Sequence, residues 1–135
     1  MTLYVGSTVL NVADLDRATA FWTAALGYVV RDADPTFVVL TDQRRRWSNV
    51  SLQRSDAPKR GRNRLHLDLY TTDQLAEVAR LESLGATRLP WEYSADADYI
   101  VMADPDGNEF CVIASPYSQD DTGRGQGKDE SPHVG

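Results

Sequence analysis

The chain has 135 residues, of which 41% are hydrophobic and 25% charged, and this length and balance are those of one ordinary globular domain. Its net charge of −6 argues against sequence-independent binding of DNA or RNA, which needs a basic surface. A single cysteine excludes an internal disulfide framework, and no apolar run is long enough to span a membrane. The first residues lack the basic region and the long apolar core of a signal peptide, so we expect a cytoplasmic protein.

The first half of the chain predicts the element order β-α-β-β-β. A strand over residues 3–12 comes first, with Ser7 and Val9 on one face, and a helix follows between an N-cap at Asp14 and a left-handed stop at Gly27. Further strands are expected over residues 28–31, 36–40 and 49–54. Residues 43–48, with three consecutive arginines, form a solvated turn or contact an anionic ligand.

The second half repeats the same order after a polar linker at residues 55–62. In the strand over residues 64–70, Leu65, Leu67 and Leu69 share one face, and His66 points to the other. A helix capped by Asp73 ends near residue 85, and its apolar stripe includes residues 75, 78, 81 and 84. Strands are expected over residues 86–91, 99–103 and 109–115, with a tight turn at residues 104–108.

The two halves form an internal repeat. Cap Asp14 corresponds to Asp73, and stop Gly27 to Gly85, at offsets of 59 and 58 residues. We therefore expect one domain over residues 1–115, made of two modules at about 1–54 and 63–115. Residues 116–135 have too few large apolar side chains to build a core, so we expect a disordered polar tail, in which His133 has no assigned role.

Four segments carry a resemblance to a known group. Val9–Trp22 (VLNVADLDRATAFW) followed by ALGY at residues 25–28 resembles the opening module of the vicinal-oxygen-chelate (VOC) superfamily, which includes glyoxalase I, extradiol dioxygenases and bleomycin-resistance proteins. Residues 104–110 (DPDGNEF) are similar to its closing hairpin. Residues 63–69 (NRLHLDL) and 108–112 (NEFCV) most resemble the glyoxalase-like domains common in actinobacteria.

This resemblance implies an α+β fold. Paired βαβββ modules would form a half-open, barrel-like curved sheet with the helices outside. A cavity between such modules, often completed in a homodimer, would take a small molecule.

The resemblance also implies where a divalent metal (Zn, Mn, Ni or Fe) would bind. The four ligand positions of metal-dependent members fall on Ser7, on Gln53 or its neighbour Leu52, on His66 and on Cys111. Serine and glutamine are weak ligands, and Glu109 could replace Cys111 only with a shifted strand register. We therefore expect no metal cofactor; if one is present, we expect it on His66, Gln53, and Cys111 or Glu109.

The remaining candidate residues have structural as well as functional interpretations. His66 is a ligand contact or general base, or simply a hydrogen-bonded side chain beside Asp68. Cys111 is expected to be a buried core residue rather than a nucleophile. Trp22, on a helix stripe, is expected in the core or an interface. The aromatic residues Trp47, Trp91 and Tyr99 line a pocket or pack at its rim.

Three functions remain open. The first is a metal-free protein of the resistance or sequestration type that encloses a small, partly aromatic or apolar molecule. Its acidic overall charge would suit a cationic ligand. The second is a metal-dependent enzyme, a glyoxalase-type lyase or isomerase or an extradiol-type dioxygenase. The third is a structural or regulatory module without a ligand. The expected ligand contacts are His66, Asp68, Gln53, Trp47, Trp91, Tyr99, Glu109 and Cys111.

Overall fold

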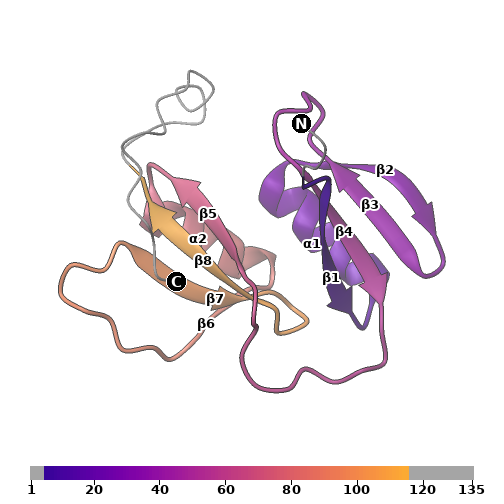
Figure 1. Cartoon of the computed structure of the whole chain (residues 1–135). Helices are drawn as coiled ribbons and strands as arrows, with labels where there is room; N and C mark the ends of the chain where they lie inside the picture. The colour runs from indigo at the N-terminus through magenta and orange to yellow at the C-terminus, as the bar shows by residue number, and fades with distance from the viewer. Residues whose placement is uncertain (1–4, 116–135) are drawn as a thin grey trace. The chain divides into compact units, whose positions relative to one another are not determined.

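The computed structural model describes residues 5–115. The predicted tail, His133 and the first four residues lie outside this range. The described chain contains two helices and eight strands (Figure 1). They are β1 (Ser7–Val12), α1 (Leu15–Leu26), β2 (Val29–Asp34), β3 (Phe37–Thr41), β4 (Asn49–Arg54), β5 (Leu67–Thr71), α2 (Gln74–Leu84), β6 (Thr87–Arg88), β7 (Tyr99–Ala103) and β8 (Glu109–Ala114).

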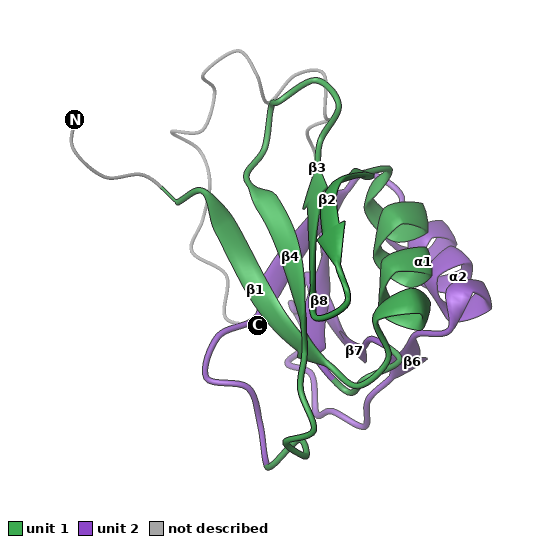
Figure 2. Cartoon of the chain, turned by 90° about the vertical axis from the view of Figure 1, so that its right-hand side faces the viewer, with its two compact units in different colours: residues 1–60, 105–107 green, residues 61–104, 108–135 purple. Residues whose placement is uncertain are grey.

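The chain divides into two compact units, coloured separately in Figure 2. The first consists of residues 1–60 and 105–107, and the second begins at residue 61 and contains the remaining described residues. Each unit has the order β-α-β-β-β and one mixed four-stranded sheet. The predicted α+β fold of paired modules with curved, unclosed sheets is therefore confirmed.

The sheet of the first unit has the order β1-β4-β3-β2. β1 runs parallel to β4, and the other neighbouring pairs are antiparallel. Helix α1 packs on one face of this sheet. There Trp22 is 1% exposed, and Leu40 and Leu52 are fully buried. This places Trp22 in the core and leaves the opposite face of the sheet free of the helix.

The ends of α1 are set by the two residues that the sequence indicates. The Asp14 carboxylate Oδ1 accepts a hydrogen bond from the Arg17 backbone N–H at 3.0 Å. Gly27 ends the helix with φ of +70°, and its N–H donates to the Thr23 carbonyl. Both interactions satisfy backbone groups that a helix end leaves unpaired, as predicted.

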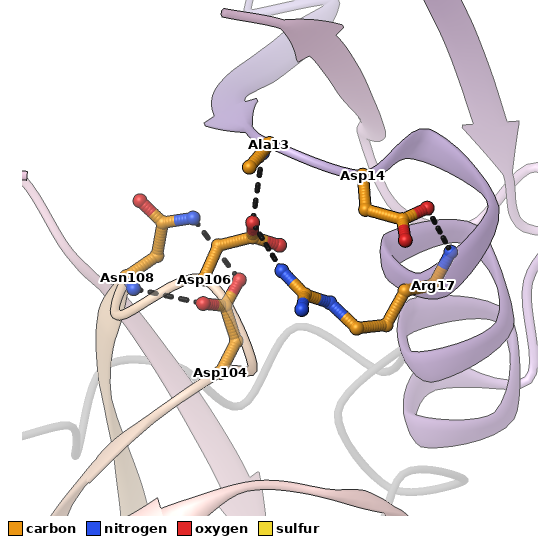
Figure 3. A network of polar contacts seen from close by, with 6 residues as sticks. All are labelled: Ala13, Asp14, Arg17, Asp104, Asp106 and Asn108. Carbon is orange, nitrogen blue, oxygen red and sulfur yellow. Dashed lines mark hydrogen bonds and ion pairs between the residues drawn. The ribbon is translucent and has the colours of Figure 1, made fainter. Parts of the chain in front are cut away.

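The tip of the β7–β8 hairpin belongs to the first unit. Asp106 Oδ1 accepts hydrogen bonds from the Ala13 backbone N–H and from Arg17 Nη2, each at 2.8 Å (Figure 3). In the same hairpin, the Asp104 carboxylate accepts from the backbone and the side-chain amide of Asn108. The Asp104 bonds close the predicted turn, and the Asp106 bonds join its tip to Ala13 and Arg17 within the first unit.

The second unit repeats this topology with the sheet order β5-β8-β7-β6, in which β5 is parallel to β8. Helix α2 packs on this sheet through Val78 and Leu81, which are buried. Two predictions were wrong in detail here: Leu65 precedes the strand and is 85% exposed, and Leu75 is 69% exposed. Asp73 is the N-cap residue of α2, as predicted, but its side chain makes no capping hydrogen bond.

Strand β6 is shorter than predicted, at two residues. Proline at position 90 has no N–H to donate to a neighbouring strand, which accounts for the early end of the ladder. Across the described part of the chain, neither helix has the length and apolar character needed to cross a membrane.

Candidate functional site

The open face of the first sheet carries a hollow of about 550 Å³. Because side chains alternate along a strand, the residues that point away from α1 gather on this face. The lining combines hydroxyl and amide groups, apolar side chains and two arginines. The lining residues are Gly6, Ser7, Val9, Arg31, Phe37, Val39, Thr41, Arg45, Trp47, Asn49 and Ser51.

The floor of the hollow is polar along β1 and β4. The hydroxyls of Ser7 and Ser51 lie 2.6 Å apart and share a hydrogen bond. Ser7 pairs across the strands with Asn49. Ser51 is 2% exposed, so its hydroxyl has little contact with water and is held in place by this bond. The floor therefore presents to a molecule in the hollow the half-buried hydroxyl of Ser7, which Ser51 holds in place, and the half-buried side chain of Asn49.

The loop between β3 and β4 forms one wall. Asp42 at its start is buried, and its carboxylate accepts from the Arg46 backbone N–H and pairs with the Arg46 guanidinium at 2.9 Å. These bonds hold the pKa of Asp42 well below its ordinary value, at about 2. The Arg46 guanidinium also lies 5.7 Å from the centre of the Trp47 ring. Arg46 therefore holds this loop in place, because it contacts both the buried Asp42 carboxylate and the Trp47 ring that lines the hollow.

Tyr28 ties the far end of this loop to the first unit. Its hydroxyl donates a hydrogen bond to the Ser48 carbonyl at 3.0 Å. Burial and the nearby Asp42 charge raise the pKa of the Tyr28 hydroxyl, which keeps it protonated as a donor.

The second unit brings three titratable side chains together at β5 and β8. Ligand atoms of His66, Asp68 and Cys111 all lie within 4.8 Å of one another. His66 Nε2 and Asp68 Oδ1 are 3.1 Å apart, and Asp68 is the strand partner of Cys111. The resemblance implies that His66 and Cys111 share a cavity. His66 was predicted within a strand but directly precedes β5, and the structure brings the three residues within reach of one ion.

Cys111 itself is 2% exposed. Burial, with added repulsion from the charges of Asp68 and Glu109, raises the pKa of its thiol to about 11. At neutral pH the group is a protonated thiol, so it is not an activated nucleophile. It packs instead with Val101 and Ile113, as expected for a core cysteine.

Glu109 pairs with residues outside this cluster. Its carboxylate Oε1 accepts from the Asn63 backbone N–H at 3.4 Å and lies 3.7 Å from Arg62 Nε. Arg62 in turn lies 4.3 Å from the centre of the Trp91 ring. Trp91 and Tyr99 pack against the apolar cluster around Cys111. Arg62 therefore contacts both the Glu109 carboxylate and the Trp91 ring.

The predicted site residues thus fall into separate groups. Trp47 and Ser7 line the hollow of the first unit, whereas Gln53 is exposed and does not line it. The alternative residue, Leu52, is fully buried on the helix side of the sheet. His66, Asp68 and Cys111 cluster in the second unit, where Glu109, Trp91 and Tyr99 make other contacts. Their roles in ligand binding remain predictions.

The lining residues that the sequence analysis did not name as individual site residues include two arginines, Arg31 and Arg45. Arg45 lies in the arginine run that was interpreted as a turn or an anion contact, so a signal for it existed. Arg31 was counted as the end of a strand. Its place depends on an irregularity in strand pairing that no sequence pattern shows.

The family resemblance implies a divalent metal, and the donor atoms of the cluster determine which ion would fit there. Nitrogen, carboxylate oxygen and sulfur donors suit zinc better than a hard ion such as manganese, because thiolate is a soft ligand. His66, Asp68 and Cys111 would hold it. A metal there would supply Lewis-acid polarisation of a bound oxygen. The fit requires that Cys111 lose its proton on binding.

Comparison with protein families identifies the chain. The family model described as "Glyoxalase-like domain" matches residues 7–113. The chain therefore belongs to the glyoxalase-like domain family. A search of curated proteins gave no significant match.

Solved structures share this fold at low sequence identity. The hypothetical protein SA1046 from Staphylococcus aureus has a TM-score of 0.65 at 16% identity, over 85% of this chain and 95% of that one. A glyoxalase/bleomycin resistance/dioxygenase family enzyme from Burkholderia phytofirmans PsJN has a TM-score of 0.65 at 17% identity, over 80% and 95% of the two chains. The E126Q mutant of the fosfomycin resistance protein FosX from Listeria monocytogenes, complexed with Mn(II) and a dihydroxypropylphosphonic acid, has a TM-score of 0.68 at 16% identity, over 85% and 91%.

Proposed function

We propose that this protein binds a small, partly aromatic or apolar molecule in the hollow of its first unit, and that it acts by sequestration. The observation that carries the proposal is the hollow itself, about 550 Å³ on a sheet face that α1 leaves open. Volumes of this size are typical of small-molecule sites, which combine apolar walls with a few placed polar groups. A cytoplasmic homodimer and membership of an actinobacterial branch belong to the same proposal.

The lining suits binding better than catalysis. It contains no histidine, carboxylate or cysteine among its residues, so it offers no conventional general base or thiol nucleophile. The hydroxyls of Ser7 and Ser51 bond to each other and have no adjacent base in the lining. Trp47 and Phe37 offer aromatic surface instead. A related fold in the fosfomycin resistance protein FosX agrees with a resistance-type role.

The test fills the hollow and asks whether ligand binding stops. Val39→Trp places a large ring on the lining, and Val30→Trp, at an exposed valine of β2 outside the lining, is the matched control. A small-molecule library is screened by the shift in melting temperature. A ligand at 100 times its dissociation constant stabilises the native state by about 2.7 kcal/mol.

We expect hits that shift the wild type and Val30→Trp but not Val39→Trp. Hits that shift all three proteins equally would place the ligand elsewhere and overturn the proposal. No hit for any protein would favour the structural or regulatory module without a ligand.

A second candidate function rests on the His66, Asp68 and Cys111 cluster in the second unit. We propose it as the site of a metal-dependent lyase, isomerase or dioxygenase, if the protein is an enzyme. The FosX structure contains Mn(II), which makes a metal in this fold chemically reasonable. The present donor set favours zinc.

Metal content measured by mass spectrometry on tag-free protein, before and after reloading with zinc, manganese, nickel or iron(II), tests this candidate. One ion per chain that is lost in His66→Ala would support it. His66 is partly exposed, so its removal should change the free energy of unfolding by less than about 1 kcal/mol. Absence of metal in the reloaded wild type would rule the candidate out.

A further inference from the structure

We propose that the hollow of the first unit selects a small organic anion. Its carboxylate or phosphoryl oxygens would lie against Arg31 and Arg45, and its flat apolar body against Trp47. This inference rests on the proposed binding function, because it specifies the ligand of the same hollow. It replaces the cationic ligand that the overall charge of the chain suggests.

The charge of the lining carries the inference. Arg31 and Arg45 are its only charged residues, and no carboxylate is among the lining residues. Within residues 5–115, neither guanidinium forms a side-chain hydrogen bond or an ion pair. Asp42, the carboxylate next to Thr41 of the lining, is occupied by Arg46. A ligand in this hollow would therefore contact two cationic side chains, although the whole chain carries a net charge of −6.

The backbone at Arg45 is unusual. Its φ of +55° is the only positive φ of a non-glycine residue in the described part of the chain. The Asp42 carboxylate fixes the residues on both sides, accepting from the backbone N–H of Arg44 at 3.4 Å and of Arg46 at 2.9 Å. Glycine or asparagine adopts this conformation at lower cost. An arginine held there is explained if its side chain is needed in the hollow.

The second arginine is placed by a different irregularity. In the pairing of β2 with β3, Val30 lies opposite Leu40 and Asp32 opposite Val39, so Arg31 is an extra residue without a partner. Such a bulge bends the strand and redirects a side chain, and bulges are frequent beside binding sites. Each of two independent backbone irregularities, the positive φ of Arg45 and the bulge at Arg31, therefore places one arginine at the same hollow.

The rest of the lining suits the body of such a ligand. Trp47 is 38% exposed, and its ring is held by the cation–π contact with Arg46. Phe37 and Val39 add apolar surface. Arginine binds carboxylate or phosphoryl oxygens through paired N–H groups, and an aromatic ring binds a flat apolar body by stacking. The combination favours an aromatic acid over a bare inorganic anion.

The test compares probes that differ in charge at constant shape. 2-Naphthoate, the neutral 2-naphthamide and the cationic 2-naphthylmethylamine are titrated into the protein, and the indole N–H signal of Trp47 is followed by NMR. We expect 2-naphthoate to bind at least tenfold more tightly than the amide and the amine not to bind. 2-Naphthyl phosphate shows whether a phosphoryl group is preferred to a carboxylate, and inorganic phosphate shows the contribution of the charge alone.

The variants Arg31→Gln and Arg45→Gln locate the charge effect. Each variant should bind 2-naphthoate about tenfold more weakly than the wild type, because a hydrogen bond to a charged group is lost. The affinity for the amide should not change. Arg44→Gln is the matched control, since it neutralises the neighbouring arginine of the same turn outside the lining. It should bind 2-naphthoate as the wild type does. Raising the salt concentration should weaken the binding of 2-naphthoate and leave the binding of 2-naphthamide unchanged.

Binding of the amide or the amine as tightly as 2-naphthoate would overturn the anion proposal and leave the hollow as a binding site. An unchanged affinity in both Arg→Gln variants, or a loss equal to theirs in Arg44→Gln, would also overturn it. Failure of all the probes, with hits of other chemistry in the library screen, would reject the anion alone. Failure of both sets would reject the binding function as well.

Discussion

The Arg46 guanidinium holds the Asp42 carboxylate on both of its oxygens. Nε lies 2.9 Å from Oδ2, and Nη2 lies 3.2 Å from Oδ1. Asp42 is almost fully buried and also accepts from the Arg46 backbone N–H. The pair fixes the loop that presents Arg45 and Trp47, so the order of one wall of the hollow depends on a single buried anion.

This pairing predicts a defined pH dependence of stability. The pKa of Asp42 is depressed from 3.8 to about 2, chiefly by the side-chain hydrogen bonds from Arg46. A depressed carboxyl pKa contributes stability that is fully present above about pH 4 and is lost as the pH falls toward 2. Asp42→Asn should therefore be less stable than the wild type at pH 7, and the difference should shrink below pH 4.

Urea unfolding between pH 2 and pH 7 measures this difference. Asp56→Asn is the matched control, because the Asp56 side chain is 87% exposed and its ion pair with Arg54 is at the surface. It should stay close to the wild type throughout. A gap between Asp42→Asn and the wild type that does not change from pH 7 to pH 2 would contradict the assigned pKa.

A second prediction concerns the hairpin tip. Asp106 is buried at its side chain and accepts from Ala13 and Arg17 (Figure 3). Asp106→Ala leaves the Ala13 N–H and the Arg17 guanidinium without this acceptor, which should lower the free energy of unfolding by about 2 kcal/mol. Asp106→Asn keeps a side-chain oxygen for the Ala13 N–H and should lose less. Urea unfolding of the two variants measures the difference, and equal losses would show that the charge alone matters.

A third prediction tests the end of α1. Gly27 has φ of +70°, and no heavy atom lies within 4 Å of the position a Cβ would take. The cost of Gly27→Ala is then backbone strain alone, about 1 kcal/mol of unfolding free energy. Gly27→Asn should lose less, because asparagine tolerates the left-handed region. Thermal unfolding compares them, and an alanine variant as stable as the wild type would contradict the strain.

The sequence predicted most of the fold because the relevant signals are local. Strand alternation and helix periodicity report burial on one face, and Asp14 and Gly27 set helix ends through bonds within a few residues. Leu65 shows where this fails. It continues the alternation of the strand, but the ladder begins at Leu67, and pairing with β8 rather than periodicity decides where a strand starts.

The site was predicted less completely, for a physical reason. Ser7 was named because it falls on a ligand position that the family resemblance implies, and Trp47 because it stands out as an aromatic residue. The position of Arg31 depends on a bulge, and that of Arg45 on a positive φ enforced by Asp42. Both are consequences of pairing and of a buried side-chain bond, which one sequence does not display. The three consecutive arginines at residues 44–46 indicated only a local positive charge, and not which of them lines the hollow.

The fourth prediction concerns Cys111, the only cysteine of the chain. Its pKa of about 11 and its 2% exposure mean that at pH 8 about one thiol in a thousand is ionised and few are accessible. The native protein should therefore react with a disulfide reagent such as DTNB far more slowly than the protein unfolded in urea, which should release one equivalent at once. Cys111→Ser is the blank and should release none. Rapid, stoichiometric reaction of the native protein at pH 8 would show that the thiol is neither buried nor of raised pKa, and would reopen its interpretation as a nucleophile.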